Sequence, residues 1–239
     1  MRPLDGQSFS ATPIGKIISP YREKFAIPRQ PGLVSAASSR IQLENHCNRE
    51  EILRGLEGFS HIWIVFVFHQ ALRETWKPMV RPPRLGGNQK VGVFASRSPY
   101  RPNAIGISVV EVSKIDQQNG QWCVHFNGGD LLNETPVLDI KPYLPYADAI
   151  PDAQGAYAQE APVIVRDIEF SPQARQQTEQ LTEKYPKLEQ LITQVLGQQP
   201  QPAYQRDTNK DFGMALYDLN IRWTNTETTL IVNSIKFNA

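Results

Sequence analysis

Polar side chains follow directly on the most apolar segment of the chain, a position that favours a binding site on a β scaffold. The segment 62–68 is a continuous apolar run of strand length, and His69 and Gln70 end it. A histidine there can contact a ligand, or it can be a hydrogen-bonded structural residue. The residue pattern leaves both interpretations open.

A second group of residues predicts a rigid cationic loop. Arg97 and Arg101 follow an apolar segment, and Pro99 and Pro102 restrict the backbone that leads to Asn103. A guanidinium can hold a carboxylate or a phosphate through two parallel hydrogen bonds, so this loop is a candidate anion site. The alternative is a set of solvated surface arginines.

Two further segments carry carboxylates. The stretch 127–130 contains two glycines, which let a ligand approach the backbone, and ends on an Asp that can accept hydrogen bonds. A plain Gly-Gly turn is equally consistent with it. Asp139, Lys141 and Tyr143 lie two residues apart, so a strand would place them on one face. They form either an acid–base cluster or a salt bridge beside a tyrosine, and the residues alone favour the salt bridge.

Several common cofactor and metal signatures are missing from the sequence. It contains no Gly-x-Gly-x-x-Gly, Walker A, His-Glu-x-x-His or Gly-x-Ser-x-Gly pattern. The four histidines and two cysteines show no paired spacing typical of zinc ligands, so no metal site is predicted. These observations disfavour a Rossmann-type enzyme, a P-loop NTPase, a zinc hydrolase and a nucleophile-elbow esterase.

Short apolar segments separated by turn residues predict that antiparallel strands position the polar groups. Expected strands cover residues 14–19, 33–37, 40–44, 60–68, 91–96, 105–115, 121–126 and 135–143, with a hairpin turn at 118–120. The strand at 60–68 is apolar on both faces and is expected to be buried. One short helix is expected at 48–56, with Asn48 as its N-cap. The pattern favours an antiparallel barrel or sandwich.

The pattern changes near residue 150. Two helices are expected over 171–185 and 186–196, with Ser171 as an N-cap, and strands are expected at 213–219, 221–224 and 230–237. The segment 145–162, rich in Ala, Pro and Asp, is the expected connection. We therefore predict a mainly β protein with two domains, residues 10–152 and 163–239, of which the second is a smaller α+β domain.

Composition sets further limits. The chain has 239 residues with 25 Lys+Arg and 24 Asp+Glu, which disfavours a charge-driven nucleic-acid binder and, with 40% hydrophobic residues, a disordered chain. Segment 73–101 nevertheless carries seven basic residues and one acid, a surface suited to a phosphate backbone or a small anion. Two cysteines favour a reducing compartment, and no membrane span or signal-peptide pattern is visible. A cytoplasmic protein without membrane contact is expected.

Six ordered segments together resemble the TsaA-like family, in its longer bacterial form. They are residues 28–33 (PRQPGL), 58–63 (GFSHIW), 67–70 (VFHQ), 81–88 (RPPRLGGN), 92–103 (GVFASRSPYRPN) and 139–145 (DIKPYLP). The resemblance is dense from about residue 12 to residue 152. It continues through the segments 200–204 and 217–223.

The resemblance implies a tRNA methyltransferase whose N-terminal domain is a single-sheet β-barrel. Such an enzyme transfers a methyl group from S-adenosylmethionine to N6 of threonylcarbamoyladenosine at position 37, next to the anticodon of threonine tRNAs. It acts as a homodimer with the cofactor near the subunit interface, and the reaction needs no metal. The residues that the resemblance assigns to the cofactor are Pro31, Gly32, Leu33, His69, Gln70, Arg97, Ile107, Asn127, Gly128, Gly129 and Asp130.

The residues expected to act in the transfer are Arg97, Asn103, Asp139, Lys141 and Tyr143. N6 of the modified adenosine is a poor nucleophile, so the site must orient it and remove a proton. We expect Arg97 and Asn103 to position the threonyl carboxylate or the ureido group. We expect the Asp139 cluster to organise or accept the proton.

The basic segment 73–101 is expected to bind the anticodon stem-loop, with Trp76 and Tyr100 available for stacking. The C-terminal domain either forms a local tRNA contact surface or mainly supports the barrel or the dimer, and the sequence leaves both interpretations open. The residues that would form such a surface are Tyr204, Arg206, Lys210, Arg222 and Trp223. Two other functions remain as alternatives, a non-catalytic tRNA-binding barrel and an S-adenosylmethionine-dependent enzyme with a small-molecule substrate.

Overall fold

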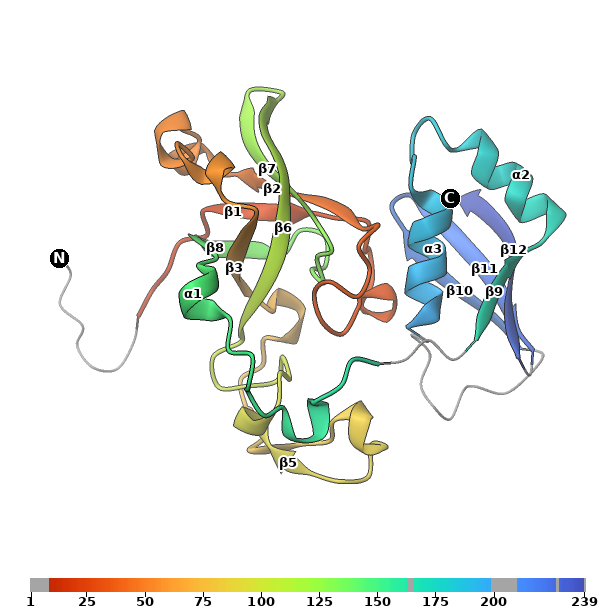
Figure 1. The fold of residues 1–239 in the computed structure, drawn as a ribbon, viewed down its shortest axis with the longest axis horizontal. Helices are drawn as coiled ribbons and strands as arrows, with labels where there is room; N and C mark the ends of the chain where they lie inside the picture. The colour runs from red at the N-terminus through yellow and green to blue at the C-terminus, as the bar shows by residue number, and fades with distance from the viewer. Residues whose placement is uncertain (1–8, 163–165, 199–209, 227, 239) are drawn as a thin grey trace.

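The computed structural model describes residues 9–162, 166–198, 210–226 and 228–238, which form two main sheets joined by an extended connection, and one small two-stranded sheet (Figure 1). Six antiparallel strands pair in the order β1-β2-β7-β6-β3-β8. They are β1 (Gly15–Ile18), β2 (Ser38–Leu43), β3 (His61–Val67), β6 (Ile105–Gln118), β7 (Gln121–Asn127) and β8 (Pro136–Pro142). A short pairing of Gly15 with Val137 and Lys16 with Pro136 joins β8 to β1, so the sheet closes as a barrel. The prediction of a mainly β, single-sheet N-terminal part is confirmed.

Strand β3 illustrates why these residues form this sheet. Ile62, Ile64 and Phe66 point into the barrel and are buried, while Trp63 and Val65 alternate to the outside and are half-buried. The strand is therefore apolar on both faces, as its sequence indicates, but only its inner face is fully buried. The interior that it helps to fill also contains Ile17, Ile41, Leu43, Val110, Val124, Phe126 and Val137.

The β6–β7 hairpin is present as predicted and is the longest feature of the barrel. Its turn lies at Asn119 and Gly120, whose φ angles are 52° and 79°. Both residues occupy the left-handed region that a two-residue type I′ hairpin requires, and Asn and Gly adopt it at low cost. The hairpin therefore extends β6 to Gln118, beyond the predicted end of that strand.

Three expected elements of the N-terminal part differ from the structure. Residues 33–37 form turns instead of a strand, and the strand expected at 91–96 is only β5 (Val91–Gly92), which pairs with β4 (Met79–Val80) before a 3₁₀ turn. The helix expected at 48–56 is a series of 3₁₀ turns interrupted by Gly55, whose φ is 87°. Asn48 does not cap a helix, because its side chain accepts a hydrogen bond from Trp122 N at 2.7 Å and donates one to Gly120 O at 2.9 Å.

The C-terminal part contains a four-stranded sheet with two helices. The order is β10 (Asp211–Leu216), β11 (Leu219–Asn225), β12 (Thr229–Phe237) and β9 (Asp167–Phe170), with β9 parallel to β12. Strand β9 was not predicted. Both predicted helices are present but shorter, as α2 (Pro172–Gln180) and α3 (Leu188–Gly197), and Ser171 Oγ caps α2 by accepting a bond from Ala174 N at 3.1 Å. The connection contains one further short helix, α1 (Pro145–Asp148).

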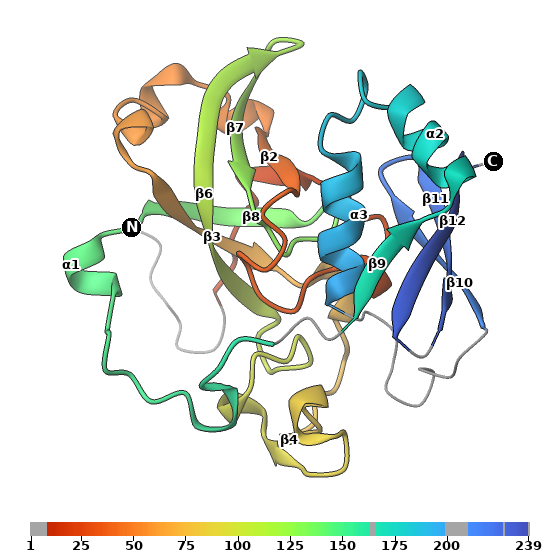
Figure 2. The same cartoon turned by 45° about the vertical axis from the view of Figure 1, so that its right-hand side comes forward.

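The segment 21–37 leaves the barrel and completes the C-terminal core. Tyr21 forms a β-bridge with Leu216, and Val34 is fully buried in the same cluster as Trp223. Helix α3 lies on the barrel side of its sheet (Figure 2), where Gln194 accepts a bond from Ala36 N at 2.9 Å. The division into domains 10–152 and 163–239 remains a prediction, and residues from the first segment supply part of the second core.

This packing corrects one expected tRNA contact. Trp223 is fully buried between the rings of Phe25 and Phe212, so it cannot form part of a surface. Lys210 and Arg222 are exposed, whereas Tyr204 and Arg206 lie outside the described residues. Within the described ranges, no helix is long and apolar enough to cross a membrane.

The shared core predicts that Tyr21 stabilises the C-terminal sheet. Tyr21→Ala should lower the free energy of unfolding by about 3–5 kcal/mol, the usual cost of removing a buried aromatic ring. Tyr21→Phe is the matched control and should be nearly neutral, because the Tyr21 hydroxyl is buried without a hydrogen-bond partner among the described residues. Urea denaturation followed by tryptophan fluorescence measures both. An equal loss in the two variants would contradict this account.

Candidate functional site

A cavity of about 750 Å³ opens at the end of the barrel where β3 stops and β6 begins. Strands β3 and β6 are antiparallel and pair Val67 with Ile105, so the residues after β3 lie beside the start of β6. Residues from four separate parts of the chain therefore meet there. The lining includes Gln30, Phe66, Phe68, His69, Gln70, Phe94, Arg97, Tyr100, Arg101, Asn103, Ile105, Ile107, Ser108 and Asp130.

Asp130 provides the carboxylate of this cavity. Ser108, a buried hydroxyl on β6, donates a 2.6 Å hydrogen bond to Asp130 Oδ1. Burial raises the pKa of Asp130 to about 6, and the bond from Ser108 and the charge of Arg97 act in the opposite direction. A carboxyl group with this pKa is mostly ionised at neutral pH and gains a proton in mildly acidic solution.

Arg97 supplies the opposite charge and is held by the segment that precedes β2. Its Nη1 donates a short hydrogen bond to Gln30 Oε1, which fixes the guanidinium at the cavity wall. The same segment is tied to the end of β7, because Gly32 N donates to Gly128 O at 2.8 Å. Gly32 and Gly128 have φ angles of 81° and 71°, in the left-handed region that glycine adopts without strain.

His69 and Gln70 lie in a 3₁₀ turn directly after β3. Burial lowers the pKa of His69, so its imidazole is mostly neutral at pH 7. Lys24 Nζ donates to Gln70 O at 2.8 Å, which ties this turn to the segment around residue 24. The neutral ring offers one donor and one acceptor at the cavity wall.

A second, more open cavity of about 1460 Å³ adjoins the first. Arg97, Phe94 and Tyr100 line both cavities. Arg29 and Arg101 also line both, and the basic and aromatic residues that line only the second cavity are Arg73, Trp76, Lys77, Arg81, Arg84, Lys90 and Tyr157. The connection borders it, since Tyr157 Oη donates to Ala95 O at 3.0 Å and Arg84 donates to Glu160 O.

Guanidinium groups lie near aromatic rings in the wall of this second cavity. Arg73 lies over the ring of Tyr100 at 4.1 Å from the ring centre, and Arg101 lies 6.0 Å from the ring centre of Phe94. Trp76 and Phe94 are exposed large hydrophobic residues. This combination of positive charge and exposed aromatic faces can hold a phosphate backbone and stack on bases.

The structure brings together only part of the predicted site. The predicted residues that line the first cavity are His69, Gln70, Arg97, Asn103, Ile107 and Asp130, and Leu33 lines the second. Pro31, Gly32, Asn127, Gly128 and Gly129 are outside both linings and lie in the two backbone segments behind the wall.

Asp139, Lys141 and Tyr143 lie away from both cavities. Asp139 and Lys141 form a 2.9 Å salt bridge on the outer side of β8, as the residue pattern favoured. The ring of Tyr143 packs at 6.1 Å from that of Trp63. None of the three lines either cavity, so within one chain they do not touch the groups described above.

Several cavity residues were not identified from the sequence. Phe66 and Phe68 pack edge to face at 5.0 Å and form an apolar wall, while Ser108, Gln30 and Lys24 hold the polar groups in place. The apolar run at 62–68 indicated a core strand rather than a cavity wall. Ser108 was detectable only as a small polar residue in an apolar strand, which is a weak signal.

Family models and known proteins match the chain over nearly its whole length. The family model described as the tRNA-methyltransferase O N-terminal domain matches residues 16–149, and that of the TrmO C-terminal domain matches residues 165–238. The Escherichia coli (strain K12) tRNA (adenine(37)-N6)-methyltransferase is 47% identical over 222 residues, covering 92% of this chain and 94% of that protein. The Pseudomonas aeruginosa protein RcsF, provisionally described as an S-adenosylmethionine-dependent methyltransferase, is 46% identical over 216 residues, covering 90% and 91%.

A solved structure agrees with these matches. The crystal structure of TrmO from Pseudomonas aeruginosa superimposes with a TM-score of 0.81 at 38% sequence identity, covering 97% of this chain and 100% of that one. The likeness therefore includes both sheets and the connection between them. The chain belongs to the tRNA-methyltransferase O (TrmO) family.

Proposed function

We propose that this protein transfers a methyl group from S-adenosylmethionine to N6 of threonylcarbamoyladenosine at position 37 of threonine tRNAs. The observation that carries the proposal is the pair of adjoining cavities, one of about 750 Å³ with the partly buried carboxylate of Asp130, the other more open and lined by basic and aromatic residues. Arg97 stands between them. The names of the E. coli and P. aeruginosa relatives support the same reaction.

The first cavity fits S-adenosylmethionine in size and chemistry. Its volume of about 750 Å³ is within the range of small-molecule sites, and its walls combine aromatic side chains with a few polar groups. Asp130 can accept hydrogen bonds from ribose hydroxyls or an amino group, and the ring of His69 offers a further contact. When bound, the cofactor supplies an electrophilic methyl group on a sulfonium, which needs no metal for activation.

Arg97 and Asn103 are placed to orient the methyl acceptor. The guanidinium of Arg97 reaches both cavities, so it can hold the threonyl carboxylate while the adenine faces the first cavity. Asn103 lines the first cavity and can bind the ureido group through its amide. Orientation matters here because N6 is a weak nucleophile whose reaction depends on alignment with the methyl group.

The proton released from N6 requires an acceptor. The expected acceptor cluster of Asp139, Lys141 and Tyr143 lies on the outer side of the barrel, so its role needs contact from a second chain and remains a prediction. A homodimer is consistent with this arrangement. Ile105 and Ile107, which line the first cavity, are also exposed, and with half-buried Val65 on β3 they form an apolar patch at its edge of the kind that interfaces cover.

The second cavity is proposed to receive the anticodon stem-loop. Its arginines and lysines can neutralise phosphates, and Trp76 and Tyr100 can stack on unpaired loop bases. The restriction to threonine isoacceptors rests on the family resemblance, because binding of the threonylcarbamoyl group by Arg97 does not by itself select the tRNA. A cytoplasmic location is proposed because the substrate is tRNA.

The reaction predicts methyl incorporation that depends on the tRNA modification. Purified protein with methyl-labelled S-adenosylmethionine should label threonine tRNA from cells that make threonylcarbamoyladenosine, and not tRNA from cells that lack it. Arg97→Ala should lower turnover roughly 10- to 100-fold, because a charged hydrogen bond is lost, and Arg97→Lys should retain part of it. Cofactor binding without tRNA labelling would favour a small-molecule acceptor. Absence of both would leave a tRNA-binding barrel.

The environment of Asp130 predicts a pH dependence of cofactor binding. The ionised carboxylate accepts stronger hydrogen bonds than the protonated group, so affinity for S-adenosylmethionine should fall as the pH drops through the pKa of Asp130, about 6. Ser108→Ala removes a bond that favours the ionised form, so the midpoint should move to higher pH. Isothermal titration calorimetry between pH 5 and 8 measures this. In Asp130→Asn binding should be weak and lose this pH dependence, and an unchanged profile would contradict the role of Asp130.

The basic lining predicts salt-dependent tRNA binding. Lys77→Ala and Lys90→Ala should weaken binding to all tRNAs, and each should reduce the slope of log affinity against log salt by about 0.7–0.9. Lys236→Ala, an exposed lysine on the C-terminal sheet, is the matched control and should leave the slope unchanged. Filter binding over a salt series gives the slopes. Equal slopes in all three variants would place the tRNA elsewhere.

A further inference from the structure

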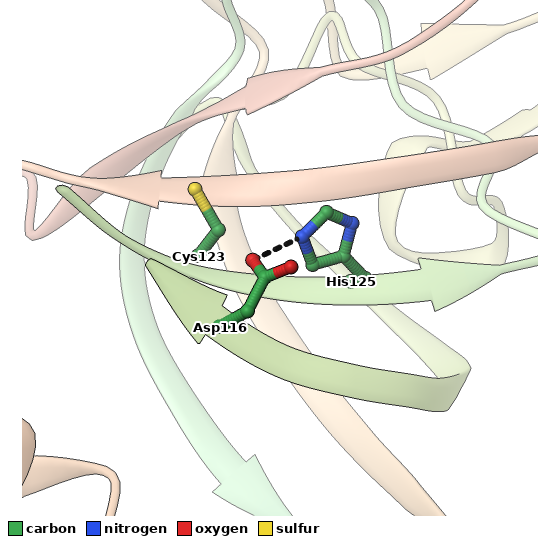
Figure 3. Close-up of side chains that lie close together, drawn as sticks. All are labelled: Asp116, Cys123 and His125. Atoms are coloured by element: carbon green, nitrogen blue, oxygen red, sulfur yellow. Dashed lines mark hydrogen bonds and ion pairs between the residues drawn. The ribbon is translucent and has the colours of Figure 1, made fainter. Parts of the chain in front are cut away.

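Three side chains of different chemistry converge on the outer face of the β6–β7 hairpin, away from both cavities (Figure 3). They are Asp116 on β6 and Cys123 and His125 on β7. One carboxylate oxygen, one sulfur and one ring nitrogen all lie within 4.8 Å of one another. Asp116 Oδ1 lies 2.8 Å from His125 Nε2.

Strand geometry produces this cluster. Cys123 and His125 are two residues apart, so they share a face of β7, opposite to Val124 and Phe126, which point into the core. Asp116 is the direct cross-strand partner of Cys123. The hairpin is a regular, hydrogen-bonded element, so the three donors are held together by the backbone rather than by a loop.

The donor set matches the preferences of zinc. Zinc takes thiolate, imidazole and carboxylate ligands in tetrahedral sites, with bonds of about 2.0–2.3 Å, so the donor atoms of a filled site lie roughly 3–4 Å apart. Here Asp116 Oδ1 and His125 Nε2 lie 2.8 Å apart, and no separation among the three donor atoms exceeds 4.8 Å. Cys123 is 1% exposed, and the side chains of His125 and Asp116 are 15% and 31% exposed. The site is therefore open to solvent on the Asp116 side.

The surrounding groups suit an occupied site. Lys114 Nζ binds Asp116 Oδ2 at 2.6 Å and leaves Oδ1 facing His125, as a second partner commonly does for a ligating carboxylate. Arg40 pairs with His125 across β2 and β7, and its Nε is buried without a hydrogen-bond partner among the described residues. Burial raises the pKa of the Cys123 thiol, and the nearby Arg40 guanidinium partly offsets this rise, so a bound metal ion has to displace the thiol proton. With Cys123 and Asp116 ionised, a divalent ion is neutralised by its own ligands.

We propose that Asp116, Cys123 and His125 form a site for a thiophilic divalent metal ion, with Zn²⁺ as the ion that fits best. On binding, the Cys123 thiol releases its proton to solvent and His125 keeps a single proton on Nδ1, so that the ion lies between His125 Nε2 and Asp116 Oδ1, and a water molecule completes the fourth position. Because the three ligands come from both strands, the ion clamps the hairpin. The site touches neither cavity, so it is independent of the proposed methyl transfer.

Cobalt is a suitable probe because Co²⁺ replaces Zn²⁺ and reports its ligands optically. Tag-free, reduced full-length protein should bind one equivalent of Co²⁺. On titration it should develop a thiolate-to-cobalt charge-transfer band together with the visible bands of a tetrahedral site. One equivalent of Zn²⁺ should abolish both. Zn²⁺ should also raise the Tm of the protein.

Matched variants separate this site from incidental binding. Cys47→Ser, which alters the other free cysteine, should behave as wild type, whereas Cys123→Ser should lose the charge-transfer band and the Tm response. His125→Gln changes a less buried position and should lose the tetrahedral bands. If Cys123→Ser fails to fold, the His125→Gln variant alone tests whether these residues bind the metal ion. Far-ultraviolet circular dichroism checks folding of each variant.

Two results would overturn the proposal. One is a wild-type titration without a thiolate band at one equivalent of Co²⁺. The other is a wrong response of the variants. The thiolate band would persist in folded Cys123→Ser or His125→Gln protein, or it would disappear in Cys47→Ser protein. The metal-binding test does not use tRNA methylation as a readout. A failure of the metal site can therefore be told apart from a failure of the proposed methyl transfer.

Discussion

Backbone pairing of six antiparallel strands into a closed sheet is the constraint on which the rest of the structure depends. Each strand contributes alternating inward side chains to one core, and the short β8–β1 pairing completes the ring. Because β3 and β6 run in opposite directions, the end of one and the start of the other must lie at the same end of the barrel. The cavity is built there, from segments that are far apart in the sequence.

The polar side chains of that cavity are held in place by hydrogen bonds to neighbouring residues, in addition to the strands that carry them. Ser108 fixes Asp130, Gln30 fixes Arg97, and the Gly32–Gly128 bond joins the two segments behind them. These contacts place opposite charges on the walls of one partly apolar space. Burial then sets the pKa of Asp130, so the electrostatics of the site are a consequence of packing.

The two sheets are linked by more than the connection between them. Segment 21–37 passes from the barrel into the C-terminal core, where Tyr21 and Val34 are fully buried. The same segment carries Gln30, which holds Arg97. The C-terminal core and the cavity wall therefore share one continuous segment of the chain.

The sequence by itself determined most strands, both long helices, the capping role of Ser171 and the polar residues at the ends of β3 and β7, because these depend on local periodicity, turn chemistry and capping. It also carried the family motifs. Only the tertiary structure decided that 33–37 and 48–56 form turns, that Trp223 is buried, and that the Asp139 cluster lies outside the cavity. The register that makes Asp116 the partner of Cys123 follows from the predicted hairpin turn, but the burial of Cys123 and the position of Arg40 beside His125 depend on β2. Burial decides the remaining features, and it arises from contacts between segments that are far apart in the sequence.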